Sequence, residues 1–163
     1  FRDDSTIKYF ENLKKLLNDL SEKFKKKIII SLHPQTNTEI YRKYLSNFNL
    51  EKYNTSKNIV KSFIVVFHES TAIDEALLLK KKIICVKSKF LGDYMNLRID
   101  RLINRFGLFK ASLEDLEKVD MNNLVKNLDE KIANYKNYKE EYIHDRVERG
   151  DDKVIRIIKE MFF

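Results

Sequence analysis

The order of hydrophobic and polar positions predicts helices that alternate with short apolar strands. Residues 3–26 are expected to form the first helix, because apolar side chains recur there every three or four residues: Ile7, Phe10, Leu13, Leu17, Leu20 and Phe24. Other apolar runs are short and rich in β-branched or aromatic residues, which favours strands. These runs cover residues 28–32, 63–67, 83–86 and 107–111.

Helices are predicted in the segments between and after these strands. The pattern Thr36-x-x-Glu39 is a capping box, and it predicts a helix that begins at Asn37 and continues to about Asn47. Further helices are expected at residues 71–79, 94–106, 121–143 and 154–163.

The alternation predicts an α/β fold with an open parallel sheet and helices on both faces, a Rossmann-like arrangement. Residues 63–67 are expected to form a central strand, since five apolar residues in a row suit a strand that is covered on both faces. The length of 163 residues fits a single domain with a hydrophobic core, so residues 1–163 are treated as one domain.

Polar residues follow each strand at the point where it ends. His33-Pro34 follows the first strand, the turn from His68 to Thr71 follows the strand at 63–67, and Lys87 begins a polar group after the strand at 83–86. Right-handed crossovers place the carboxyl ends of parallel strands on one edge, where ligands of open α/β sheets bind. These residues are therefore expected to converge.

The turn at residues 68–71 is the strongest candidate for binding an anion. Ser70 or Thr71 is expected to cap a helix that begins at Thr71, because a hydroxyl oxygen accepts from the backbone amides of the first turn. Open amides, a positive dipole end and hydroxyl groups suit a phosphate. The alternative is an ordinary capped helix of an α/β domain.

Composition narrows the classes of function without choosing among them. Hydrophobic residues make up 43% and charged residues 35%, a globular balance, and the net charge of +7 is spread along the chain, so it indicates no particular function. Cys85 is the only cysteine, which fits a reducing compartment. No stretch suits a membrane span or a signal peptide, so a cytoplasmic protein is expected.

Several motifs are missing from the chain. Gly92, Gly107 and Gly150 cannot build a glycine-rich phosphate loop, and no Cys/His spacing suits a metal, so no metal is expected.

The arginines at positions 98, 101 and 105 share a helix face, which is expected to be solvated and paired with Asp100. Tyrosines between lysines near the C-terminus indicate a half-buried helical stripe rather than nucleic-acid binding.

The motifs His33-Pro34, Phe67-His68-Glu69-Ser70-Thr71-Ala72-x-x-Glu75-Ala76-Leu77 and Lys81-Lys82-Ile83-Ile84 resemble the C-terminal half of a GT-B glycosyltransferase. The closest resemblance is to bacterial enzymes of capsule and surface-polysaccharide synthesis, of the sialyltransferase-like and CDP-glycerol glycerophosphotransferase-like kinds. It covers roughly residues 27–90, with weaker support from residues 145–158. The chain is then expected to be a fragment of a larger two-domain protein.

The resemblance implies that this half binds the nucleotide-activated donor, of CMP, CDP or UDP type, as a substrate and without a separate cofactor. His33, beside Pro34, would contact the nucleotide, and Ser70 with Thr71 would hold the phosphate. Glu75 matches the position of an acid directed toward the ribose, while His68 and Glu69 depart from the usual residues before the hydroxyl pair. Lys87 joins this nucleotide- and phosphate-binding set by its place at a strand end.

The same resemblance places the carbohydrate acceptor and the catalytic base on a missing N-terminal domain, so no catalytic residue is assigned. Peripheral association with the inner face of the membrane stays open, as does the oligomeric state. Two alternatives also stay open. One is a UDP-N-acetylglucosamine 2-epimerase-like enzyme domain, and the other is a non-catalytic α/β domain that binds anions or proteins through its basic helices.

Overall fold

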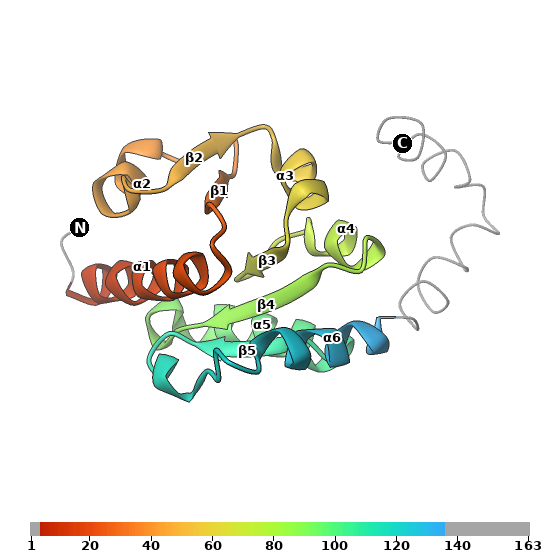
Figure 1. Cartoon of the computed structure of the whole chain (residues 1–163). Coiled ribbons are helices and arrows are strands. Elements are labelled where there is room, and N and C mark those ends of the chain that lie inside the picture. Colours follow the sequence, from red (N-terminus) through yellow and green to blue (C-terminus); the bar gives the residue numbers. More distant parts are fainter. Residues whose placement is uncertain (1–3, 136–163) are drawn as a thin grey trace.

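A computed structural model describes residues 4–135 of the chain and shows an α/β fold in which every paired strand is parallel (Figure 1). The helices are α1 (Asp4–Phe24), α2 (Thr38–Leu45), α3 (Thr55–Lys61), α4 (Ile73–Leu78), α5 (Gly92–Phe106) and α6 (Leu124–Asn134), with 3₁₀ turns η1 (Lys89–Leu91) and η2 (Leu116–Lys118). The strands are β1 (Ile29–Leu32), β2 (Asn49–Lys52), β3 (Ile64–Phe67), β4 (Lys82–Lys87) and β5 (Phe109–Ser112). The helix expected at 154–163 and the end of the one expected at 121–143 lie outside the described residues.

The described strands form two sheets instead of the single one expected. One sheet pairs β1 with β2, and the other has the order β3-β4-β5. The prediction that residues 63–67 form the central strand is therefore wrong, because β4 lies between β3 and β5. Residues 83–86 of β4 are all buried, whereas residues 64–66 of β3 are only half-buried. A strand is sealed on both faces only where neighbours and helices surround it.

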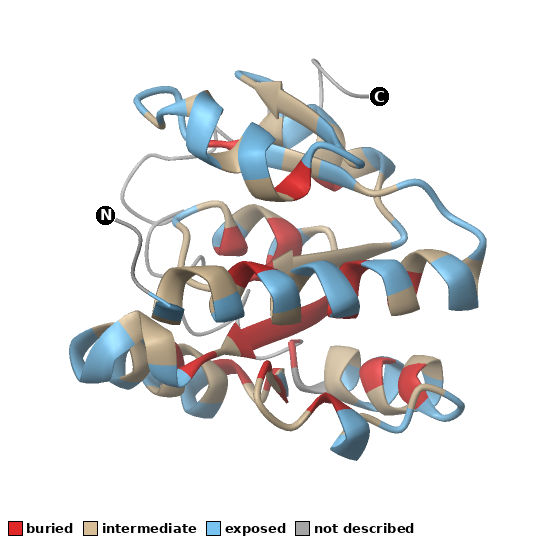
Figure 2. Cartoon of the chain, turned by 90° about the vertical axis from the view of Figure 1, so that its left-hand side faces the viewer, coloured by how far each residue is buried: buried red, intermediate tan, exposed pale blue. Residues whose placement is uncertain are grey.

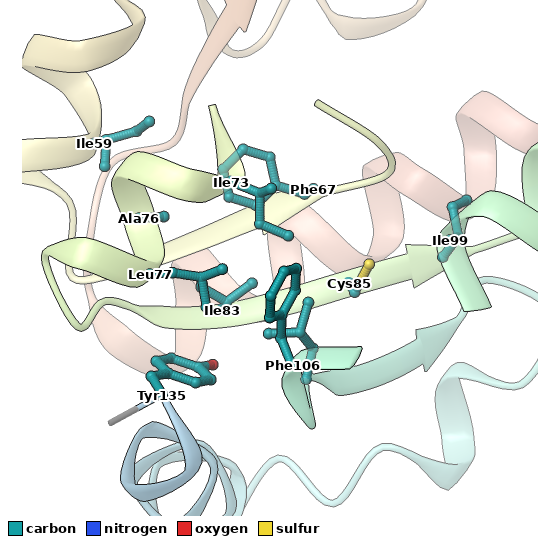
Figure 3. Close-up of a cluster of buried hydrophobic side chains, with 11 residues drawn as sticks. Ile59, Phe67, Ile73, Ala76, Leu77, Ile83, Cys85, Ile99, Phe106 and Tyr135 are labelled. Carbon is teal, nitrogen blue, oxygen red and sulfur yellow. The ribbon is translucent and has the colours of Figure 1, made fainter. Parts of the chain in front are cut away.

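Helices cover both faces of the three-stranded sheet, as the sequence predicts. Alternate residues of β4 enter two different cores, since successive side chains of a strand point to opposite faces. Ile84 and Val86 pack with residues of α1 and α6, and Ile83 and Cys85 pack with residues of α4 and α5. Figure 3 shows this second core, where Phe106 and Leu77 lie around β4, and Figure 2 shows in red the buried middle of this strand.

Helix α1 contacts the elements of both sheets. Its Phe10 stacks on Tyr44 of α2, with ring centroids 4.6 Å apart, and meets Tyr41 edge-on at 5.7 Å. One to three turns later, Leu16 and Leu20 enter the core beneath β4 and β5. In Figure 1, β1 and β2 lie above β3, and no strand pairing joins the two sheets within the described residues. The packing of α1, together with that of α3, which contacts both β1 and α4, therefore connects the two sheets without a continuous ladder.

Two helix starts differ from the capping predicted from the sequence. Helix α2 begins after Asn37, whose Oδ1 accepts from the backbone amide of Glu39 at 2.9 Å, so the capping residue is Asn37 and not Thr36. Asparagine and threonine both satisfy a first-turn amide at this position. The sequence alone therefore does not show which of these two neighbouring residues caps the helix. Helix α4 begins at Ile73, two residues later than expected.

The aromatic contact between α1 and α2 can be tested by truncating Phe10. Phe10→Ala removes a buried ring together with its contacts to Tyr41 and Tyr44. We therefore expect a loss of about 3 kcal/mol in the free energy of unfolding. Hydrogen exchange should show the amides of β1 and β2 losing more protection than those of β4. The matched variant Leu128→Ala, in the core under β4, should instead weaken protection in β4 and β5. Equal effects of both variants on both sheets would contradict the role given to Phe10.

Candidate functional site

The turn between β3 and α4 satisfies its own backbone. Ser70 Oγ accepts from the amide of Ala72 at 3.2 Å, and the carbonyl oxygens of Ser70 and Thr71 accept from Ile73 and Asp74. Ala72 itself provides no side-chain cap. The prediction of a helix that begins at Thr71 with open first-turn amides is therefore wrong, because these amides are paired within the turn. Thr71 is exposed and Ser70 is half-buried, so the hydroxyl of Thr71 faces solvent more than that of Ser70.

His68 is held between two other elements by both of its ring nitrogens. Its Nδ1 lies 3.1 Å from the carbonyl oxygen of Val86 on β4, and its Nε2 lies 2.5 Å from the hydroxyl of Tyr9 on α1. A carbonyl can only accept, so Nδ1 carries the proton and donates it, and Nε2 of the neutral ring accepts from Tyr9. Burial disfavours the charged ring and lowers the pKa of His68, partly opposed by the bond to Val86.

Glu69 forms an ion pair with Arg98 of α5. The side chain of Glu69 is 19% exposed and that of Arg98 is 47% exposed, so the pair lies at the border of solvent. Arg98 also approaches Tyr94, with its guanidinium 5.7 Å from the ring centroid. The expectation that this arginine pairs with Asp100 is wrong, because Arg98 pairs with Glu69 of the turn after β3 and Asp100 pairs with another cation.

That cation is Lys87 at the end of β4, whose Nζ lies 2.5 Å from Asp100 Oδ2. The neighbouring Ser88 is buried and donates to Glu114 Oε1 at 2.6 Å, and Glu114 Oε2 also accepts from Ser112 at 3.3 Å. The carboxyl ends of β4 and β5 are thus joined by one carboxylate and tied to α5 by another. Glu69 is thus paired with Arg98 and Lys87 with Asp100, which offsets the loss of hydration of these groups.

His33 and Pro34 lie in the turn that follows β1, and both are exposed. His33 Nδ1 accepts from the amide of Gln35 at 3.2 Å, and Lys52 Nζ donates to the carbonyl oxygen of Pro34 at 3.0 Å. Within residues 4–135 no hydrogen bond or ion pair joins this turn to residues 68–71. The expected convergence of His33 with Ser70 and Thr71 is therefore not seen as a direct contact.

The carboxyl edge of β3, β4 and β5 does bring several of the predicted residues together. His68, Glu69 and Lys87 lie at this edge and each contacts a helix or a neighbouring strand, whereas Glu75 lies half-buried in the first turn of α4. Sequence reasoning missed Tyr9, which bonds His68 across 59 positions of the chain. No local pattern marks such a partner, because Tyr9 reads as one more residue of an amphipathic helix.

Two classes of feature are not found among residues 4–135. No cluster of three or more His, Cys, Asp or Glu side chains could hold a metal ion, and no helix is long and apolar enough to cross a membrane. Comparison of the chain with protein-family models, with curated proteins and with solved structures finds no match.

The Tyr9–His68 hydrogen bond can be tested by removing the hydroxyl alone. Tyr9→Phe keeps the ring but leaves His68 Nε2 without its donor in a half-buried place. We expect a loss of about 1 kcal/mol in the free energy of unfolding, measured with urea. The control Tyr41→Phe, on α2, should change this free energy by less. A Tyr9→Phe protein as stable as the original would show that the bond contributes nothing.

The lowered pKa of His68 predicts that stability falls in mild acid. The folded protein resists protonation below the ordinary value of 6.5, while the unfolded chain takes up the proton, so unfolding is favoured as the pH falls from 6.5 toward the folded pKa. The slope approaches about 1.4 kcal/mol per pH unit within that window. Urea unfolding between pH 7.5 and 5 should show this slope, and His68→Gln should flatten it. A slope that survives in His68→Gln would disprove the assignment.

Proposed function

We propose that the chain binds the nucleotide part of an activated donor, a nucleotide sugar or a CDP-alcohol. In this proposal it is the C-terminal half of a GT-B type glycosyltransferase that builds a surface carbohydrate in the cytoplasm. The observation that supports it best is the break between the two sheets, that is, the lack of strand pairing between the sheet β1-β2 and the sheet β3-β4-β5 within the described residues. Strand β1 pairs with β2, whereas the chain beyond β2 returns to begin a sheet in the order β3-β4-β5. Ligands of open parallel sheets bind at the carboxyl ends of strands where the order reverses.

The residues on either side of this break have suitable chemistry for a nucleotide. His33 follows β1 as an exposed ring, and Thr71 follows β3 as an exposed hydroxyl in a turn that Ser70 holds in shape. A ligand that spans the break would contact both, which removes the need for direct contact between them.

The cations near this edge can bind phosphate by exchange of partners. Arg98 is paired with Glu69 and Lys87 with Asp100, and both cations retain part of their surface in solvent. A diphosphate carries more charge than one carboxylate and accepts two parallel hydrogen bonds from a guanidinium. Arg98 is the more exposed of the two and is therefore the better candidate for this exchange.

The proposal assigns donor binding to this chain and leaves the acceptor and the catalytic base to another domain. The exposed Tyr94 and Leu97 on α5, beside Arg98 and Arg101, favour the alternative of an interaction surface for an acidic partner. The two functions differ in what they require, because nucleotide binding depends on the strand ends and the alternative depends on α5 alone.

The test is an NMR titration of the full chain with CMP, CDP and UDP. We expect the amide signals of Ser70, Thr71 and Lys87 to shift, while those of Ile29 and Lys82, at the starts of strands, stay in place. Thr71→Asp adds a negative charge at the proposed phosphate position and should weaken binding at least tenfold.

The matched control is Asn104→Asp, which adds the same charge near the end of α5, close to where β5 begins. It should leave nucleotide binding unchanged. The absence of shifts with all three nucleotides would exclude the proposal, and equal weakening by both variants would place the ligand elsewhere.

A further inference from the structure

Two exposed rings follow the last registered pair of the two-stranded sheet. Leu32 of β1 is paired with Lys52 of β2, and the next residue on each strand is His33 and Tyr53. Adjacent strands lie about 4.8 Å apart, so the two rings begin from neighbouring points on the carboxyl edge.

Tyr53 has two properties that packing does not explain. The residue is 79% exposed, the highest value among the exposed large hydrophobic residues in the range 4–135. Its φ angle is +65°, in the left-handed region that a bulky residue rarely adopts. A glycine or asparagine would adopt this conformation at lower cost, and an exposed ring gains little from burial in return. Strain at such a position points to a role in binding.

Hydrogen bonds on both sides hold the backbone around Tyr53. Asn54 Nδ2 donates to Glu51 Oε2 at 3.3 Å, so the residues before and after the ring are joined. Lys52 Nζ donates to the carbonyl oxygens of Pro34 at 3.0 Å and Thr36 at 2.8 Å, which fixes the turn that carries His33. The two rings therefore stand on turns that are tied to each other. Such preorganisation reduces the entropy that a ligand must overcome on binding.

We propose that Tyr53, flanked by His33, is the platform on which the base of the nucleotide stacks. This inference rests on the proposed function and names the part of the ligand that the β1–β2 edge receives. A planar base stacks on an aromatic ring without a demand for a particular sequence of hydrogen bonds, so cytosine and uracil are both accommodated. The ribose and phosphates then extend from this edge toward the turn at Ser70 and Thr71.

The experiment compares a ligand that has a base with one that lacks it. The affinities of UDP and of inorganic pyrophosphate for the full chain are measured by calorimetry. Tyr53→Ala should weaken UDP about tenfold and leave pyrophosphate unchanged, because only UDP loses the stacked ring. Tyr53→Phe keeps the ring and should restore the affinity for UDP. Circular dichroism checks that each variant is folded, as expected for so exposed a residue.

Tyr94→Ala is the matched control, since Tyr94 is 71% exposed and lies on α5. Because Tyr94 contacts Arg98, any effect of this variant should change both ligands alike and leave their ratio intact. If the original protein binds neither ligand, the proposed function fails. If it binds UDP and Tyr53→Ala either has no effect or weakens both ligands equally, the proposed function stands and the stacking role of Tyr53 is wrong.

Discussion

The packing of α1 is the constraint on which the arrangement of this protein depends. No backbone ladder joins β1 to β3 within the described residues, so helices connect the two sheets. Helix α3 contributes through Asn58, which donates to Ser31 of β1, and through Ile59, which packs in the core around β4. Phe10 fixes α2 to the helix, and Leu16 and Leu20 fix the helix to the core under β4. Dispersion and apolar burial are non-directional, so they hold two sheets together without imposing a strand register. The strands of the two sheets consequently remain unpaired with each other.

The same helix also determines the chemistry at the end of β3. Tyr9 lies one residue before Phe10, and its hydroxyl reaches His68 as the strand gives way to the turn. The ring of His68 is thereby fixed as the neutral tautomer that donates to β4. Beyond it, Glu69 and Lys87 are both tied to α5. Charges of both signs are stable at a half-buried edge only when they are paired. These pairs also hold the turn after β3 in a single conformation.

Hydrophobic periodicity was sufficient to predict the α/β class, the parallel strands and the helices on both faces. It could not predict which strand is central, because the apolar runs at 63–67 and 83–86 look alike and differ only in the neighbours that the fold provides. It placed polar residues at strand ends correctly, since chain direction in a parallel sheet decides this. Periodicity could not predict the partners of those residues. Tyr9, Arg98 and Glu114 come from distant elements, and no local spacing encodes them.

The two carboxyl edges offer different chemistry, and this difference constrains what can bind across them. The edge of β1 and β2 presents exposed rings at His33 and Tyr53, while the edge of β3 and β4 presents hydroxyls and cations held by carboxylates. A purely anionic ligand would gain nothing from the first edge, and a purely aromatic one would leave the charges of the second edge unused. A ligand with a flat base at one end and phosphate at the other uses both. In this proposal the exposed ring of Tyr53 serves binding and not packing, which agrees with its left-handed backbone and its exposure.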